Sequence, residues 1–237
     1  MNNKKTLVST TIAGVMALSA FSASAADLSI KVTNLTHGIA FTPLLVASHD
    51  ADTHLFKSGE AASMALQKMA EGGAIDDLAD EVTTAGGHVV KNPHGKLLMP
   101  GETTEAFDFN TMDDTHLSLT AMLLPTNDAF AGTDSWKIPT EAGTYTFTVN
   151  AYDAGTEANN ELYVAGAGAP GALGIPAFPV GTPGTNGSGL ATEDTNKMVH
   201  IHPGNVGDAM ADGGKSDLDN TVHRWLNPVL RVTVTVK

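Results

Sequence analysis

Asp153 and Glu157 stand four residues apart, with Gly155 between them to let the backbone fold back. They follow Tyr145–Tyr152, in which apolar and polar side chains alternate with the period of a strand that buries one face. Two carboxylates on one turn suit calcium, which binds about six to eight oxygen atoms in a flexible cage. A solvated acidic loop has the same pattern, so the calcium interpretation needs at least one more ligand from elsewhere in the chain.

A second group of residues could bind a softer cation. His200 and His202 are two residues apart on a predicted strand over 197–202, so their rings share one face. His49 ends another apolar strand. Two imidazoles on one face and a third from another strand would form a copper or zinc site. The alternative is that these histidines only hydrogen-bond neighbouring loops.

The sequence gives little support for catalysis. It has no Gly-x-Ser-x-Gly elbow, no His-Glu-x-x-His and no phosphate-binding glycine loop. We therefore predict that the protein is not an enzyme.

Residues 1–25 have the three parts of a secretory signal peptide. Lys4 and Lys5 precede an apolar run over 12–21, and Ala23-Ser24-Ala25 gives a small-residue cleavage pattern. The apolar run is too short to cross a bilayer, and no later stretch comes close. These features predict a periplasmic or extracellular protein without a transmembrane segment.

The composition limits the classes of partner and of metal ligand that are expected. The chain has 13 basic and 26 acidic residues and a net charge of −13, which makes nucleic acid an unfavourable partner. It has no cysteine, which excludes disulfides and thiolate ligands. Residues 26–237 are enough for one domain with a substantial core, and neither a repeat nor a linker divides them.

Alternating apolar residues predict strands in several places, including both ends of the mature chain. Pro43 interrupts the extended run over 39–48 and implies an edge or a bulge there. Strands are expected at 28–32, 39–48, 96–99, 104–109, 116–124, 145–152, 197–202 and 230–236.

Two helices are expected between the early strands. Ser58 can cap a helix over 61–70 that Gly72 and Gly73 end, and a shorter acidic helix spans 75–82. A loop rich in Gly, Ala and Pro spans 158–196, a length typical of functional segments. This pattern predicts an all-β fold, an antiparallel β-sandwich with one or two short inserted helices, whose end loops carry the functional sites.

Four segments are distinctive together: Phe41–His49, Met122–Gly132, Tyr152–Glu157 and the stretch that begins at Trp225. They resemble the spondin domain in its bacterial secreted form. Pro-x-x-Asp and Asp-Ala-Gly-Thr-acid occur in this order, each after a predicted strand, and the similarity extends over nearly all of residues 26–237.

The resemblance implies a calcium ion held in the loops at one end of a β-sandwich, with Asp128, Asp153 and Glu157 as ligands. Glu157 stands where the family usually has Asp, and Ala129 stands where it usually has Trp. The implied function is that of an exported calcium-binding module in extracellular-matrix or adhesion-type interactions. Its partner, whether a protein, a glycan or a lipid surface, is left open. The alternative function is a periplasmic copper or zinc protein that uses His49, His200 and His202.

The histidine interpretation makes a prediction. Titration of the mature protein with nickel, copper or zinc should reveal a site at neutral pH that weakens toward pH 5, because the ligating imidazoles become protonated. Binding that is independent of pH, or that survives replacement of His200 and His202 by Ala, would remove this site.

Overall fold

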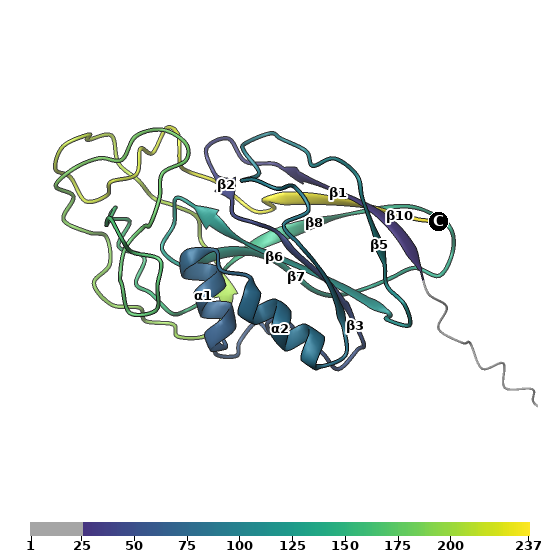
Figure 1. Cartoon of the computed structure of the whole chain (residues 1–237). Coiled ribbons are helices and arrows are strands. Elements are labelled where there is room, and N and C mark those ends of the chain that lie inside the picture. Colours follow the sequence, from purple (N-terminus) through teal and green to yellow (C-terminus); the bar gives the residue numbers. More distant parts are fainter. Residues whose placement is uncertain (1–25) are drawn as a thin grey trace, which may run out of the picture.

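The computed structural model describes residues 26–237, and the predicted signal peptide lies outside them. Ten strands form an antiparallel sheet that curls into a nearly closed, barrel-like structure (Figure 1). Two short helices lie between the early strands, so the predicted all-β class with inserted helices is confirmed. The elements are β1 (Asp27–Asn34), β2 (Ala40–Phe41), β3 (Leu45–His49), α1 (Met64–Gly72), α2 (Asp76–Thr84), β4 (His88–Lys91), β5 (Phe107–Asn110), β6 (His116–Leu124), β7 (Ala129–Lys137), β8 (Gly143–Asp153), β9 (His200–Ile201) and β10 (Leu230–Val236).

Strand β8 connects the two halves of the sheet. Its residues 143–149 pair with β10, whereas its residues 150–153 pair with β7. The strand order is β4-β3-β6-β7-β8-β10-β1-β5, and β2 and β9 pair with β6 and β8. The halves face each other across a core to which β1 and β10 contribute from one side and β3, β6 and β7 from the other. The strands of both halves therefore enclose one core within a nearly closed, barrel-like sheet.

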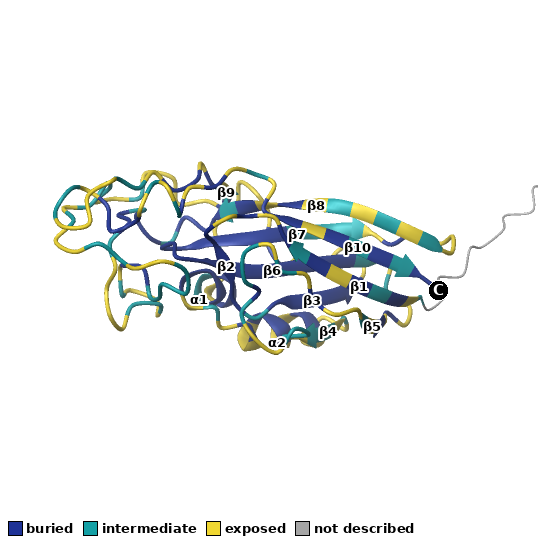
Figure 2. Ribbon diagram, turned by 90° about the horizontal axis from the view of Figure 1, so that it is seen from above, coloured by how far each residue is buried: buried dark blue, intermediate teal, exposed yellow. Residues whose placement is uncertain are grey.

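The helices cover the outer face of one half. Helix α1 contacts β6 and β7, and α2 contacts β3 and β4. For this reason β3 is buried along its whole length, and β6 along all but its first residue. Strand β10 instead alternates between buried and exposed or half-buried residues, whereas β8 alternates between half-buried and exposed residues until Val149, Ala151 and Asp153 are buried near its end (Figure 2). A second core, which joins helix residues such as Leu66 and Met69 to residues of β3, β6 and β7, fills the space between the helices and the sheet.

The sequence patterns predicted some of the strand and helix boundaries correctly and others wrongly. Pro43 does interrupt its extended run, which becomes β2 and β3. Ser63, not Ser58, caps α1 by accepting a hydrogen bond from the Leu66 N–H at 3.1 Å, and Gly73 at φ 73° ends it. The expected strand at 96–99 is reduced to a single bridge at Leu98, and β4 and β7 were missed.

The long segment after β8 has little regular strand pairing. Hydrogen bonds to buried carboxylates hold it in place instead. Glu161 is buried and accepts hydrogen bonds from the N–H groups of Val206 and Gly207 at 2.6 and 2.8 Å, and from Ser216 Oγ at 2.6 Å. These bonds tie the start of the segment to residues more than forty positions later. The loops gather at the end of the sheet away from the C-terminus (Figure 1).

Glu161→Ala should therefore loosen this end of the molecule. The change leaves three donors without their acceptor and should cost on the order of 1–3 kcal/mol of unfolding free energy. Faster amide exchange at Val206 and Gly207 would reveal the local effect. Glu141→Ala, at an exposed position, is the matched control. Unchanged exchange at both amides would contradict the role given to Glu161.

Candidate functional site

Asp128 joins two loops that are far apart in the sequence. It is fully buried, and its Oδ2 accepts hydrogen bonds from the N–H groups of Thr156 and Glu157 at 2.9 and 3.1 Å, and from Thr156 Oγ1 at 3.2 Å. It immediately precedes β7, whose first residue, Ala129, pairs with Asp153 at the end of β8. The connection between β6 and β7 and the loop after β8 therefore meet at one end of the sheet, as the sequence predicted.

Asp153 and Glu157 complete a group of three buried carboxylates. Asp153 is 1% exposed, and its oxygens accept hydrogen bonds from the Gly155 N–H at 2.8 Å and from Asn159 Nδ2 at 2.6 Å. Glu157 is 6% exposed, and its Oε2 accepts from Asn127 Nδ2 at 3.2 Å and from the Gly174 N–H at 3.3 Å. The structure thus brings all three predicted calcium ligands into one region.

Gly155 allows the turn between Asp153 and Glu157. Its φ is +69°, which side chains rarely tolerate. A Cβ atom there would lie 2.7 Å from the Lys197 carbonyl carbon and 2.8 Å from the Asn196 oxygen. Only glycine lets the segment before β9 approach this loop so closely.

Two oxygens in this group have no hydrogen-bond partner. Both Asp128 Oδ1 and Glu157 Oε1 are buried and unpaired. Buried polar atoms are usually satisfied, and an unpaired buried carboxylate is costly. A hard cation bound to these oxygens would satisfy them, so the residues present fit calcium.

The pKa values of the three carboxylates reflect the cost of burying their charges. Burial, together with the charges of Asp153 and Glu157, raises the pKa of Asp128 to about 8. Burial also raises the pKa of Glu157 to about 7, with a contribution from the charge of Glu71, and burial raises the pKa of Asp153. Each carboxylate is therefore harder to ionise here than in water.

The three carboxylates do not close on a single point. Within residues 26–237, no three His, Cys, Asp or Glu side chains are already gathered as a metal cluster. Calcium accepts amide and main-chain oxygens as ligands, and Asn127, Asn159 and Asn160 supply such groups to the same hydrogen-bond network. These asparagines, and the buried Glu71 of α1, carried no recognisable signal in the sequence.

The histidines divide between the two ends of the sheet. His200 Nδ1 and His202 Nε2 each lie 3.9 Å from an oxygen of Asp153. His49, by contrast, pairs with His116 at the start of β6, whereas Asp128 follows the end of that strand. The structure does not bring His49 together with the other two, because the length of β6 separates them.

The nitrogens of His49 and His202 already have partners in the protein. His49 is buried between the Asp50 carbonyl at 2.6 Å and Ser118 Oγ at 2.7 Å. His202 Nδ1 accepts from the Gly204 N–H at 2.9 Å, which leaves a proton on Nε2, 3.3 Å from Asn159 Oδ1. Burial and the nearby charge of His200 lower the pKa of His202 to about 3, so it is neutral. Hydrogen bonding accounts for both residues without a transition metal.

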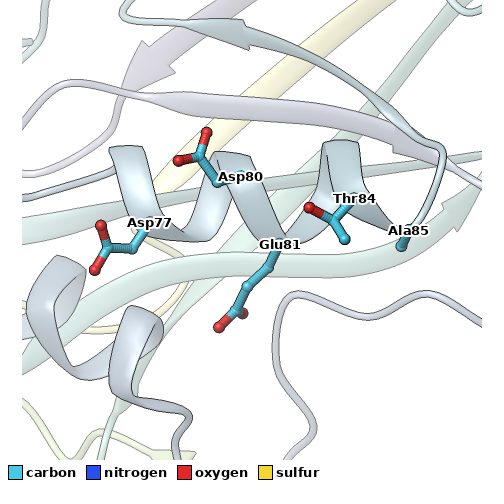
Figure 3. Close-up of a pocket in the computed structure, with 5 residues that line it drawn as sticks. All are labelled: Asp77, Asp80, Glu81, Thr84 and Ala85. Atoms are coloured by element: carbon cyan, nitrogen blue, oxygen red, sulfur yellow. The ribbon is translucent and has the colours of Figure 1, made fainter.

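A different acidic surface lies on α2. A hollow of about 500 Å³ is lined by Asp77, Asp80, Glu81, Thr84 and Ala85 (Figure 3). Its three carboxylates point in different directions and do not converge. It lacks the buried, unpaired oxygens that mark the loop end.

The model of the Spondin_N family matches residues 33–163, more than half of the chain. The chain belongs to the Spondin_N family. The matched part contains Asp128, Asp153 and Glu157, whereas β9, β10, His200 and His202 lie beyond it. No curated protein matches the chain. Spondin_N domains are typically extracellular modules, and among residues 26–237 no helix is long and apolar enough to cross a membrane.

The raised pKa values predict how the Spondin_N domain responds to pH in the presence of a chelator. Unfolded Asp and Glu release their protons near their ordinary values of 3.8 and 4.5, whereas folded Asp128 and Glu157 hold theirs up to about 8 and 7. The native state binds more protons between these limits, so its stability should fall as pH rises from about 4 to 8. Thermal melting across this range in chelator measures the effect.

Asp128→Asn separates this effect from other titrations. Asparagine keeps an oxygen that accepts from the N–H groups of Thr156 and Glu157, but it removes a buried charge. In chelator at pH 8, the free energy of unfolding of the variant should therefore exceed that of the original protein by on the order of 1–3 kcal/mol. Its melting temperature should also depend less on pH. A variant that is less stable at pH 8, with the original pH profile, would show that Asp128 is not a source of repulsion.

Proposed function

We propose that this Spondin_N domain is an exported calcium-binding module, in which calcium orders the loops at one end and those loops engage a partner. The single observation that carries the proposal is the meeting of Asp128, Asp153 and Glu157, with buried oxygens on two of them left unpaired. Asp128 Oδ1 and Glu157 Oε1 would be ligands, and Asp153 would add a third carboxylate. Calcium would supply charge neutralisation at a point where three loop carboxylates otherwise repel one another.

A binding role suits the surface around this site. Most of the large hydrophobic side chains that are exposed on residues 26–237 lie between β8 and β10, in the segment that forms much of the loop end. They are Tyr163, Val164, Leu173, Met198, Ile201, Val206, Met210 and Leu226. Leu173 among them lines the same cavity as Glu157, so an exposed apolar group lies beside the acidic residues and favours an interaction surface there.

An open cavity lies beside Glu157. It measures about 460 Å³, and its lining includes Glu157, Leu173, Asp194 and Lys197. Both charge signs and an apolar side chain are therefore available to a partner next to Glu157. We propose adhesion-type binding, to a protein, a glycan or a lipid surface, rather than catalysis, in accord with a sequence that has none of the catalytic motifs sought.

Calcium should stabilise the protein measurably. If the site resembles other extracellular modules, with a Kd of about 10⁻⁴ to 10⁻³ M, then ~10 mM calcium adds about 1.4–2.7 kcal/mol to the unfolding free energy. For a domain of this size the melting temperature should rise by roughly 3–10 °C above its value in chelator.

Asp153→Ala should abolish this shift, because it removes a carboxylate from the site. Asp108→Ala removes an exposed carboxylate on β5 that pairs with Lys237, and this variant should keep the shift in melting temperature. The proposal fails if calcium leaves the melting temperature of the unaltered protein unchanged, or if Asp153→Ala responds to calcium as strongly as the unaltered protein does.

A further inference from the structure

A second open cavity lies on the outer face of β7 and β8, and none of its lining residues takes part in the calcium site proposed above. It measures about 360 Å³. The segment over 54–58, just before α1, forms one wall, and outward side chains of the two strands form the other. A cavity of this size accommodates a small ligand such as roughly one or two sugar rings.

An aromatic cluster forms the floor of this cavity. The ring centroid of Phe56 lies 4.9 Å from that of Tyr152 and 5.0 Å from that of Phe130. Phe56 and Phe130 are buried, whereas Tyr152 is half-buried and lines the cavity. Tyrosine combines an apolar ring with a polar hydroxyl, so it offers a surface for the C–H groups of a sugar and a hydrogen bond for one of its hydroxyls.

Several polar side chains around this floor have no partner inside the protein. Within residues 26–237, no hydrogen bond or ion pair engages the side chains of four residues that line the cavity: Lys57, Thr148, Asn150 and Tyr152. They present an ammonium, an amide and two hydroxyls, which together donate and accept hydrogen bonds. A ligand rich in hydroxyl groups matches this set and displaces only water from it, without breaking a bond within the protein.

The wall formed by the segment over 54–58 is fixed against β7. Asp134 accepts hydrogen bonds from the Leu55 N–H at 2.9 Å and from His54 Nδ1 at 2.5 Å. A Cβ atom on Gly132 would lie 2.6 Å from Phe56 Cε1, so glycine lets the ring of Phe56 lie against the strand. A wall that is already in place lowers the cost of ordering the site when a ligand binds.

A bulge in β7 aims Asp134 at this wall. The pairing of β6 with β7 shifts register between Leu117 and Leu119, and Ser135 has a φ of +58°. A positive φ is uncommon for serine, and bulges re-aim side chains beside functional sites. The chain thus keeps a strained residue where it positions the cavity, and strained residues cluster at ligand-binding sites.

The charge of the cavity disfavours an ionic ligand. Its lining contains one ammonium, Lys57, and one carboxylate, Asp134, which cancel when His54 is neutral, although the whole chain has a net charge of −13. Each oxygen of Asp134 already accepts a hydrogen bond within the protein. Neither an anion nor a cation therefore finds a complementary excess of charge here.

We propose that this cavity binds a neutral saccharide, a hexopyranose of the gluco, galacto or manno configuration. Its ring would lie against Tyr152, and its hydroxyls would bond to Asn150 and Lys57. This inference goes beyond the proposed calcium-binding function and does not depend on it. It names the class of ligand and places it on the outer face of the sheet.

The methyl glycosides of glucose, galactose and mannose are suitable probes, with binding to the full mature protein followed by saturation-transfer NMR. At least one should bind at millimolar concentration. Tyr152→Ala should weaken its binding by about tenfold or more, because the ring surface is lost. Asn150→Ala should also weaken it, and this residue is exposed, so the variant tests the site without disturbing the aromatic cluster. Tyr163→Ala removes an exposed tyrosine outside the cavity and should bind like the unaltered protein.

Several results would overturn the inference. They are binding of none of the three glycosides, or equal binding by the unaltered protein and by both Tyr152→Ala and Asn150→Ala. Stronger binding of the methyl glycoside of glucuronic acid than of glucose would show that the ligand is anionic. Sugar affinity should be the same in calcium and in chelator, and its loss in chelator would place the sugar at the calcium centre instead. A protein that binds sugar but does not respond to calcium would contradict the proposed function alone.

Discussion

Repulsion among buried carboxylates is the constraint on which the loop end of this protein depends. Four carboxylates are removed from water: Asp128, Asp153, Glu157 and Glu71. The repulsion between like charges is stronger in the protein interior than in water. Backbone N–H groups and asparagine amides satisfy part of this charge, and they leave one oxygen unpaired on each of Asp128, Glu157 and Glu71. The protein therefore maintains an arrangement that is unfavourable without a bound proton or cation, which is typical of a binding site rather than of a structural core.

The fold holds this arrangement in place through β8. Residues 143–149 of β8 pair with β10 and residues 150–153 with β7, and β9 pairs with the other edge of the last two residues, so the end of β8 is fixed from both sides. Asp153 is the last residue of β8, and Asp128 directly precedes the neighbouring strand β7. Rigid strands thus carry the carboxylates to the rim, while the loops beyond them supply the remaining hydrogen bonds.

The long segment after β8 takes part in the same design. It contains little regular structure, yet Glu161 and other carboxylates order it through main-chain donors. It lies against Gly155 and against the backbone of Glu71 and Gly72, and it leaves an open cavity beside Glu157. Several large apolar side chains on this segment are exposed.

The sequence alone determined the features that have a local physical signal. Alternation predicted β1, β6, β8 and β10, because side chains on a strand point to opposite faces, and the acids at and just after the end of β8 marked it as a predicted calcium site. Strand β7 was missed because Ala129–Gly132 is buried on both faces and does not alternate, and Ser58 was chosen as the helix cap because nothing local distinguishes it from Ser63. Motif resemblance correctly grouped Asp128 with Asp153 and Glu157, across more than twenty residues of chain.

Only the tertiary structure decided which other residues join them. His49 looked equivalent to His200 and His202 but lies at the far end of β6, since distance in space depends on strand pairing and not on residue type. Glu71 looked like an ordinary charged helix residue, but it is fully buried in the structure, and Gly168 packs on its backbone. Burial changes the chemistry of a carboxylate, and burial is a property of packing between distant segments that no local pattern encodes.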